Sequence, residues 1–358
     1  MSRAPNVKTR AVRIIGGGMA GLFLGLRLRQ AGVEATVVES GRYPRHRDCG
    51  EFMAGAGETF MQRSGLRFDS PAFPRHRATR WYAGGHEVLR CMLPRPALGV
   101  SRHVLDHLLA DAFRAAGGTL LEGVRERGNG SDDPPGTVRA TGRRACPSPW
   151  IGLKAHYTGL TAEGLAVHLG RRAYVGVAPV EGGRVNVCGL FRKRPGLSAQ
   201  REKALPAYLR ASGLAELADR LDGAVLDPAS LCGVAAFRFS PSFAGRGSGL
   251  CLGDRIGVIP PFTGDGMSLA LESAESALPH LVAYARGESP WPETVARVRA
   301  AHATLFKGRF RWARRLHPFL LHPAGAFAVR LAAVSGFLPF SLLYRRTHAP
   351  LPPCTSKA

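Results

Sequence analysis

The chain has 358 residues, 45% of them hydrophobic and 8% aromatic, which is enough sequence for one large core or for two. Lysine and arginine outnumber aspartate and glutamate by 49 to 26, giving a formal net charge of +23. No apolar run reaches the roughly 18 residues of a membrane-spanning helix, which argues against an integral membrane protein.

The positive charge does not by itself indicate a nucleic-acid-binding protein. Of the 49 cationic residues 43 are arginine and 6 are lysine, and they are scattered along the chain. No helix-turn-helix, zinc-finger or RNA-binding-sheet signature accompanies them. We therefore expect no nucleic-acid partner.

The cysteines favour a reducing compartment. There are seven, an odd number without paired spacing, which argues against a disulfide framework. No Cys-x-x-Cys pair is present, so we expect no zinc ribbon and no metal site. The basic N-terminal residues precede an apolar run that is too short for a signal peptide, and we expect a cytoplasmic protein.

The N-terminal part of the chain has the pattern of a strand, a helix and a second strand. An apolar run at 11–15 predicts a buried strand, apolar residues at helical spacing predict a helix over 19–31, and 34–39 predicts the next strand. Further along we expect strands at 79–82 and 86–92 and a helix over 101–116.

A different pattern occupies residues 150–239. The segments "WIGLKAHYTG", "GLAVHLG", "AYVGVAPV" and "RVNVCGLF" predict successive antiparallel strands, followed by helical pieces over 202–221. The preceding tract "RERGNGSDDPPG" (125–136) is a turn-rich connection. An alternating pattern returns near residue 249, and the chain is then largely helical to its end.

Three glycines stand directly between the first strand and the first helix. Gly16, Gly18 and Gly21 form G-x-G-x-x-G, in which the first permits a tight turn, the second lets backbone amides approach a pyrophosphate and the third lets the helix pack on the strand. Glu39 ends the second strand, where a carboxylate can accept hydrogen bonds from both hydroxyls of a ribose. An ordinary glycine-rich turn with a surface glutamate is the alternative. The expected binding residues of this motif are Gly16, Gly18, Met19, Ala20, Gly21, Glu39 and Ser40.

A second motif favours FAD over NAD. In "LCLGDRIGVIPPFTGDGMSLALES" an apolar strand ends in Gly253-Asp254, and a proline-rich loop leads into a helix that starts near Gly266. Asp254 is placed to bind the polyol chain of FAD, and the helix start to present amides to a ring that becomes negative on reduction. NAD has no such polyol; a surface turn is the alternative interpretation. The expected binding residues are Gly253, Asp254, Pro261, Gly264, Gly266 and Met267.

With both motifs, the chain resembles the single-Rossmann FAD oxidoreductases that include hydroxylases of the p-hydroxybenzoate hydroxylase fold and geranylgeranyl reductases. The segment "PRHRDCGEFM" is similar to the P-R-x-x-x-C-G segment of the reductase-like branch, and "GVSRHVLDHLL" to a stretch whose arginine, here Arg102, faces the cofactor. The resemblance covers about residues 10–285. It implies a mixed α/β fold: a Rossmann-like FAD-binding domain, an inserted antiparallel substrate sheet and a helical C-terminus.

The resemblance also implies a division of the chain into three regions. We expect a discontinuous FAD-binding domain of 1–77, 97–148 and 240–290, a substrate domain of 78–96 and 149–239, and a C-terminal helical region of 291–358.

Two departures from the family pattern bear on the electron donor and on the reaction type. The Asp-Gly motif associated with FAD and NADPH is replaced by "VRATGRRA" (138–145), which argues against direct use of NADPH, although NADH or NADPH stays a candidate transient electron donor. The Trp-x-Trp-x-Ile-Pro motif of flavin halogenases is missing from "SPWIGLK", which makes halogenation a minor alternative.

Three residues are candidates for chemistry beside the flavin. Cys49 is expected to face the flavin or the substrate. The equal alternative is that Cys49 is only a small buried residue without a chemical role. Lys154 and His156 alternate on a predicted strand and so share one face, which either lines the substrate cavity or holds side chains that are solvated or satisfied in the core. The primary hypothesis is an FAD-dependent monooxygenase acting on a hydrophobic prenyl, polyketide or aromatic substrate. The alternatives are a C=C reductase and a flavoprotein that binds FAD or lipid without turnover.

The C-terminal region adds a second partner to consider. Its arginine clusters alternate with apolar helices broken by Pro318, Pro323 and Pro339. Packing on the FAD domain explains this pattern most simply, and peripheral contact with an anionic membrane is the second expectation.

Overall fold

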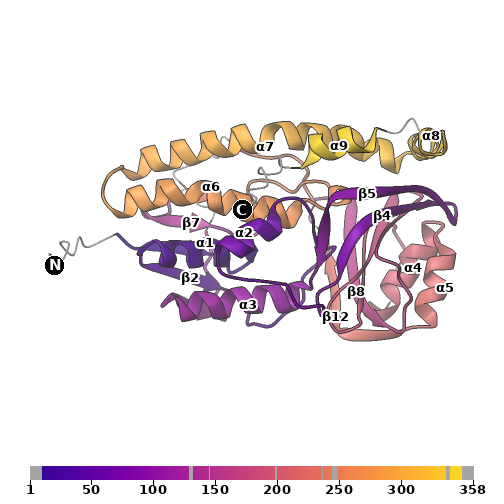
Figure 1. Cartoon of the computed structure of the whole chain (residues 1–358), viewed down its shortest axis with the longest axis horizontal. Helices are drawn as coiled ribbons and strands as arrows, with labels where there is room; N and C mark the ends of the chain where they lie inside the picture. Colours follow the sequence, from indigo (N-terminus) through magenta and orange to yellow (C-terminus); the bar gives the residue numbers. More distant parts are fainter. Residues whose placement is uncertain are drawn as a thin grey trace, which may run out of the picture.

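The computed structural model describes residues 10–128, 132–144, 146–197, 200–235, 237–243, 249–335 and 339–348. Two sheets lie next to each other along the long axis of the molecule, and a layer of C-terminal helices crosses over both (Figure 1). The outermost residues of the first and last expected regions, 1–9 and 349–358, fall outside the described residues, as do 129–131 of the predicted loop and Ala145 of the replaced Asp-Gly segment.

The first sheet is parallel and has the strand order β13-β7-β1-β2-β6. Its central strand β1 pairs on one side with β2 and on the other with β7. The carboxyl ends of these two neighbours therefore flank the end of β1, which is where parallel α/β sheets bind ligands. The strands are β1 (Val12–Ile15), β2 (Ala35–Glu39), β6 (Thr119–Glu122), β7 (Thr137–Arg139) and β13 (Leu250–Cys251).

Helices cover this sheet with apolar side chains at helical spacing. The helix α1 (Met19–Gln30) packs against α3 (Arg102–Ala115) and α6 (Gly266–Ala285), and their side chains join one core with β1 and β2. Ser101 caps α3 by accepting a hydrogen bond from Val104 N at 3.1 Å. The alternation of strand and helix that the sequence predicted is thus confirmed for this unit.

The second sheet has the order β12-β8-β11-β10-β9-β4-β5-β3. The sequence predicted an antiparallel sheet, and this is wrong at one join, because β4 and β9 are parallel. The chain enters this sheet twice, and strands that no hairpin connects are not forced to be antiparallel. The strands are β3 (Phe52–Met53), β4 (Arg75–Ala83), β5 (His86–Gly99), β8 (Trp150–Thr158), β9 (Leu165–Gly170), β10 (Ala173–Pro179), β11 (Val185–Arg192) and β12 (Val225–Val234).

The strand β5 continues well beyond the predicted end at Met92. Pro94 and Pro96 lack the amide hydrogen that a ladder needs, and the pairing with β4 shifts where they occur, from Ala78–Met92 to His76–Ala97. Proline is tolerated at such an irregularity near the edge of a sheet. Two short helices, α4 (Ala204–Ala211) and α5 (Ala215–Asp222), pack on this sheet, which agrees with the helical pieces predicted over 202–221.

Both expected pieces of the substrate domain contribute strands to the second sheet. The strands β4 and β5 run from Arg75 to Gly99, slightly outside the expected piece 78–96, and β8 to β12 fall within 149–239. The exact domain boundaries stay a prediction.

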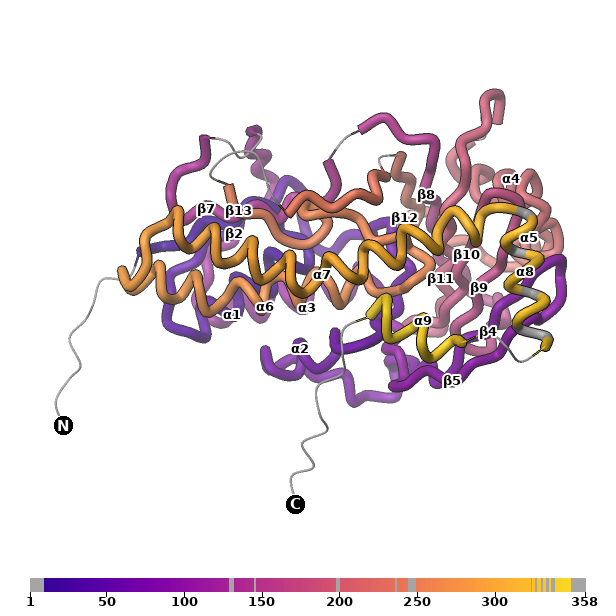
Figure 2. The backbone as a smooth tube through the Cα atoms, turned by 90° about the horizontal axis from the view of Figure 1, so that it is seen from above, coloured from indigo at the N-terminus to yellow at the C-terminus, as the bar shows by residue number. Residues whose placement is uncertain are grey.

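The helical layer consists of α7 (Trp291–Leu321), α8 (Pro323–Val334) and α9 (Phe340–Thr347). Seen from above, α7 runs along most of the molecule, from the parallel sheet to the second sheet (Figure 2). Arg309 of α7 reaches Asp265, at the start of α6, at 3.0 Å, and it also pairs with Glu272 of α6. Among the described residues, no helix combines the length and the hydropathy that crossing a bilayer requires.

We predict that Arg309→Ala destabilises the fold strongly. The change leaves two carboxylates, Asp265 and Glu272, buried without their cation, and breaking a buried pair in this way costs about 3–5 kcal/mol. Thermal unfolding followed by circular dichroism measures the loss. The matched control is Arg311→Ala, because Arg311 lies on the same helix but is exposed. Equal melting temperatures of the two variants would contradict the buried ion pair.

Candidate functional site

One cavity of about 1090 Å³ opens at the carboxyl ends of the parallel strands and extends to the second sheet. At its first end the walls are the turns that follow β1, β2, β7 and β13. At its other end they are apolar side chains of the second sheet, of the segment after β12 and of the loop before α6. These apolar residues are Val167, Leu190, Leu231, Val234, Phe237, Val258 and Phe262.

The glycine turn has the geometry for which the three glycines are needed. Gly16 has φ +107°, and a Cβ there would lie 2.4 Å from Ala140 O. A Cβ at Gly21 would lie 1.9 Å from Gly16 O, so the helix packs directly on the turn. At Gly18 a Cβ would meet nothing within 4 Å, because this position faces open space at the start of α1. Backbone amides are therefore accessible at the helix N-terminus, where a phosphate is favoured.

Glu39 is buried beside this turn and surrounded by donors. Its carboxylate accepts from the amides of Gly17 and Gly41, each at 2.8 Å, and pairs with Arg45 at 2.9 Å and Arg47 at 3.5 Å. Burial alone would raise the pKa of the Glu39 carboxyl, but the charges of Arg47 and Arg45 and the two amides outweigh it and hold the pKa below its usual value. Glu39 is thus an anion at the cavity wall.

The second motif meets the same cavity from the opposite side. Gly253 (φ +57°) and Gly264 (φ +69°) take the left-handed backbone conformation that favours glycine, and Gly266, at the start of α6, has no heavy atom within 4 Å of the position of a Cβ. The second helix N-terminus is therefore also open. Asp254 is about one-third exposed and pairs with Arg143 at 3.2 Å.

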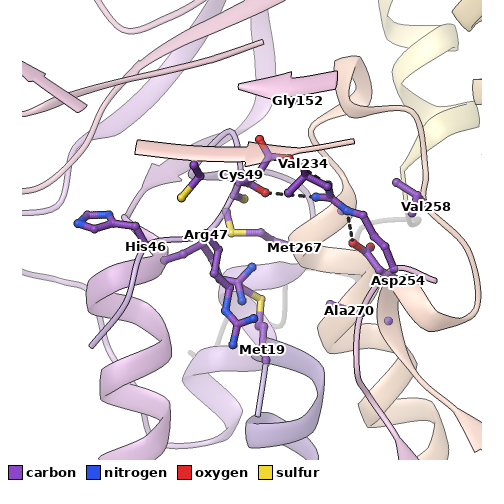
Figure 3. Close-up of a pocket in the computed structure, with 18 of the residues that line it drawn as sticks. Met19, His46, Arg47, Cys49, Gly152, Val234, Asp254, Val258, Met267 and Ala270 are labelled. Atoms are coloured by element: carbon purple, nitrogen blue, oxygen red, sulfur yellow. Dashed lines mark hydrogen bonds and ion pairs between the residues drawn. The ribbon is translucent and has the colours of Figure 1, made fainter. Parts of the chain in front are cut away.

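Arg143 links the second motif to the loop that carries Asp48 and Cys49. Besides Asp254, it binds the Asp48 carboxylate at 2.9 Å and lies 4.6 Å over the Phe237 ring. Burial alone would lower its pKa, but Asp254 and Asp48 together raise it, so Arg143 is a permanent cation. In Figure 3, the dashed lines at Asp254 mark one end of this bridge, and Cys49 and Met267 lie between Asp254 and His46 in the view.

Most of the residues predicted to bind the cofactor line this one cavity. Gly21 is the exception, since it packs against Gly16 behind the turn. Their role in holding a cofactor stays a prediction. The predicted residues on the cavity wall are Gly16, Gly18, Met19, Ala20, Glu39, Ser40, Arg102, Gly253, Asp254, Pro261, Gly264, Gly266 and Met267.

Arg102 lies on the cavity wall, and its guanidinium is already paired with an acidic side chain. Its guanidinium binds Asp106 through two hydrogen bonds of 2.8 and 2.7 Å. Asp106 also binds Arg47 at 2.8 Å. The Asp106 carboxylate of α3 therefore holds both Arg102 and Arg47 at the edge of the cavity.

Cys49 lines the cavity between the two ends. Its sulfur accepts a hydrogen bond from the Glu51 amide at 3.5 Å. Burial raises the pKa of the Cys49 thiol, so the group is a neutral thiol near neutral pH and not a thiolate nucleophile. A role in orienting substrate or in transferring a proton suits it better than attack.

Lys154 and His156 lie on one face of β8, as alternate residues of a strand must. Glu51 packs against that face and binds both side chains. The Lys154 ammonium lies 3.0 Å from Glu51 Oε1, and His156 Nε2 is hydrogen-bonded to Glu51 Oε2. All three side chains are fully buried. Neither Lys154 nor His156 is on the cavity wall, whereas Glu51 is. Any catalytic role of these two residues is therefore an indirect one, and it stays a prediction.

Glu51 is ionised in spite of its burial. Burial alone would raise the pKa of its carboxyl, but the hydrogen bond from His156 and the charge of Lys154 outweigh this and hold the pKa below its usual value. The backbone amide of Arg102 donates a further hydrogen bond of 2.9 Å. The residue also has φ +57°, a conformation that non-glycine residues adopt rarely.

His46 continues this network onto the cavity wall. Its Nδ1 accepts from Lys154 Nζ at 3.3 Å, and its ring stacks on His103 with centroids 4.5 Å apart. Burial, followed by the charge of Lys154, lowers the pKa of His46 to about 4, so its imidazole is neutral near neutral pH.

His46, His156 and Asp227 bring potential ligand atoms within 4.8 Å of one another, but they do not fit a metal ion well. Since Lys154 donates to Nδ1 of His46, the proton of the neutral ring is on Nε2, the atom that faces Asp227 at 4.0 Å. A metal would require that nitrogen to be unprotonated, with an ammonium group close behind the ring.

Glu51, His46, Asp48 and Arg143 were missed at the sequence level. For His46, Asp48 and Glu51 the available signal was the density of charged residues in "PRHRDCGEF", between two apolar segments. Nothing local distinguishes these positions from a solvated loop, because their partners lie on β8 and after β7, far along the chain.

No family model and no curated protein sequence matches this chain. Solved structures do. A probable FAD-dependent monooxygenase, PqsL from Pseudomonas aeruginosa, is 18% identical with a TM-score of 0.68, over 89% of this chain and 98% of the other. The flavin-dependent brominase Bmp2 is 16% identical with a TM-score of 0.70, over 93% and 96%. A geranylgeranyl bacteriochlorophyll reductase-like protein from Thermoplasma acidophilum is 15% identical with a TM-score of 0.71, over 96% and 94%.

These similarities extend over nearly the full length of each protein. At such low identity they show a shared fold and nothing finer. The chain has the fold of the FAD-dependent oxidoreductases, as its sequence motifs predicted.

We predict that Glu51→Gln lowers the free energy of unfolding by about 3–5 kcal/mol near neutral pH, since it leaves Lys154 buried without its anion. The native pKa of Glu51 lies below its ordinary value of 4.5, so its stabilising effect is complete above about pH 4.5 and is lost as the pH falls through the native pKa. The difference between wild type and variant should shrink accordingly.

Urea unfolding at neutral pH and at several acidic pH values measures this difference. Glu163→Gln is the control, because the Glu163 side chain is 70% exposed, and it should change stability little at any pH. A wild-type advantage that stays constant down to acidic pH would mean that Glu51 is not the ionised centre of the cluster.

Proposed function

We propose that this protein is an FAD-dependent oxidoreductase that hydroxylates a hydrophobic substrate. The observation that carries the proposal is that two open helix N-termini, at Gly18 and Gly266, meet in one cavity whose far end is apolar. The first end suits a dinucleotide and the second suits an apolar molecule. The full-length similarity to flavin-dependent structures supports the same interpretation.

The residues of the first end fit FAD. Gly18 leaves room for a pyrophosphate at the start of α1, and the Glu39 anion suits the hydroxyls of a ribose. Asp254 suits the ribitol, and the open start of α6 suits the flavin ring. Bound flavin would supply the redox chemistry, namely electron transfer and the activation of oxygen.

The chain's own contribution is to orient the substrate and to exclude water. Apolar side chains such as Leu231, Val234 and Phe237 provide a dry wall for a prenyl, polyketide or aromatic molecule. Arg143 closes one side of this space by binding Asp48 and Asp254. Neutral His46 and ionised Glu51 are the cavity-facing groups of a buried network through which a proton can be held near the substrate.

Double-bond reduction is the second candidate, favoured by Cys49. This thiol lies on the wall of the cavity, is neutral, and can donate a proton after a hydride has reached an alkene. The electron donor is proposed to be NADH or NADPH acting transiently. We also propose a cytoplasmic location, in keeping with the free cysteines of the described residues.

We predict that Gly18→Val abolishes FAD binding while the fold survives. Gly18 has φ −79°, which valine tolerates, but the new side chain would enter the space proposed for the pyrophosphate. Flavin content of the purified variant, measured by absorption, and its circular dichroism test the two halves of this statement. Gly308→Val is the matched control, since a Cβ at Gly308 on α7 also meets nothing within 4 Å, and it should retain flavin. Full flavin occupancy in Gly18→Val would reject the assignment.

A second measurement separates hydroxylase from reductase. The protein is reduced chemically and then offered 1-naphthol, emodin or geranylgeraniol as an aromatic, polyketide or prenyl probe. We expect one probe to accelerate reoxidation by oxygen and to gain one oxygen atom by mass spectrometry. Reoxidation of the flavin with consumption of the probe in the absence of oxygen would favour the reductase, and Cys49→Ser should then abolish that step while FAD stays bound. No response to any probe, with flavin bound, would favour a flavoprotein without turnover.

A further inference from the structure

The end of the chain has an extreme charge composition. After Glu293 there is no aspartate or glutamate, and residues 294–358 contain 11 lysine and arginine residues. This segment therefore carries almost half of the net charge of +23. Its helices α7, α8 and α9 form the outer layer over both sheets (Figure 1).

Four of these cations form a stripe on the exposed side of α7. Lys307, Arg311, Arg314 and Arg315 are spaced so that they share one helix face, and all four are exposed. Among the described residues, no acidic side chain pairs with any of them, whereas the buried Arg309 of the same helix has two acidic partners. We call the four residues the cationic stripe.

A groove runs beside the cationic stripe. It has a volume of about 460 Å³, its apolar walls are Pro241, Phe243 and Phe310, and all four cations of the stripe line it. A groove with apolar walls and a cationic rim matches a molecule that has an anionic head and an apolar body.

Exposed apolar side chains follow the stripe in the chain, at the end of α7 and on α8 and α9. Phe319 at the end of α7 is 45% exposed, Phe327 and Leu331 of α8 are 66% and 61% exposed, and Leu342 of α9 is 51% exposed. Two further exposed cations, Arg345 and Arg346, follow Leu342 on α9. Nucleic acid would match the cations alone, whereas exposed aromatic and aliphatic side chains among cations match the headgroup region of a bilayer.

We propose that α7, α8 and α9 dock the protein on a bilayer that contains anionic phospholipid. The cations meet the phosphates, and the exposed apolar side chains enter the boundary between headgroups and acyl chains. On its inner side α7 reaches the cavity wall, since the His317 ring packs against Tyr174 and Phe262 with centroids 5.9 and 6.4 Å apart. The docking stands independently of the proposed reaction.

Sedimentation of the full chain with vesicles tests the proposal. We expect binding to phosphatidylcholine vesicles that contain phosphatidylglycerol, little binding to phosphatidylcholine alone, and weaker binding as salt is raised. Replacing Arg311, Arg314 and Arg315 together by glutamine should weaken binding by about a hundredfold, at roughly fivefold per cation near the surface. The double variant Phe327→Ser, Leu331→Ser should bind vesicles more weakly than the wild type at high salt, where the electrostatic part of the binding is screened.

Matched controls keep the test specific. Replacing Arg171, Lys193 and Arg194 by glutamine removes the same charge from exposed positions in the segments that follow β9 and β11, and Val225→Ser changes a 69% exposed apolar residue of β12. Both should bind vesicles like the wild type, and circular dichroism confirms that each variant is folded.

Three results would overturn the proposal. One is equal vesicle binding by the stripe variant and the control variant. Another is binding to double-stranded DNA without binding to anionic vesicles. The third is complete displacement from vesicles by soluble glycerol 3-phosphate at the same concentration as lipid phosphate, which would make the groove a site for a free anion.

Discussion

One buried carboxylate, Glu51, connects the second sheet to the helix α3, which packs beside the parallel sheet. Glu51 belongs to the loop between β2 and β3. It binds Lys154 and His156 of β8, and it accepts a hydrogen bond from the Arg102 amide at the start of α3. A buried ion gains stability only when its partners are in place, so this cluster fixes the relative position of loop, helix and sheet. The cavity between the sheets depends on that position, since Glu51, Cys49 and His46 of the same loop form its wall.

The cavity joins two chemically different environments. Near the parallel strands, glycines keep side chains away from two helix N-termini, which leaves backbone amides and a positive dipole end that would favour an anionic group. Near the second sheet, the wall carries apolar side chains. Arg143 stands at the junction, and because it binds both Asp48 and Asp254 it couples the loop that carries Cys49 to the second glycine motif. A cofactor that binds Asp254 must therefore share it with this arginine or displace it.

The helix α7 connects the surface of the molecule to the site. Its inner face holds α6 through Arg309, and the partner Asp265 immediately precedes the open N-terminus at Gly266. Farther along, His317 packs among the aromatic side chains at the apolar end of the cavity. The same helix exposes the cationic stripe, so a surface that suits anionic lipid lies on the element that also supports both ends of the cavity.

The sequence alone determined the local parts of this structure. The glycine turn with Glu39, the Gly253-Asp254 loop and the helix at Gly266 were predictable because close backbone approach and left-handed conformations restrict the residue type at each position. The parallel pairing of β4 with β9, the length of β5 and the partners of Glu51, Lys154 and Arg143 were not predictable. Each of these joins residues far apart in the chain, and a lysine on a strand has the same local pattern whether it faces solvent or a buried glutamate. Only the tertiary structure, by burying both charges together, decided that Lys154 and His156 support the cavity wall from behind.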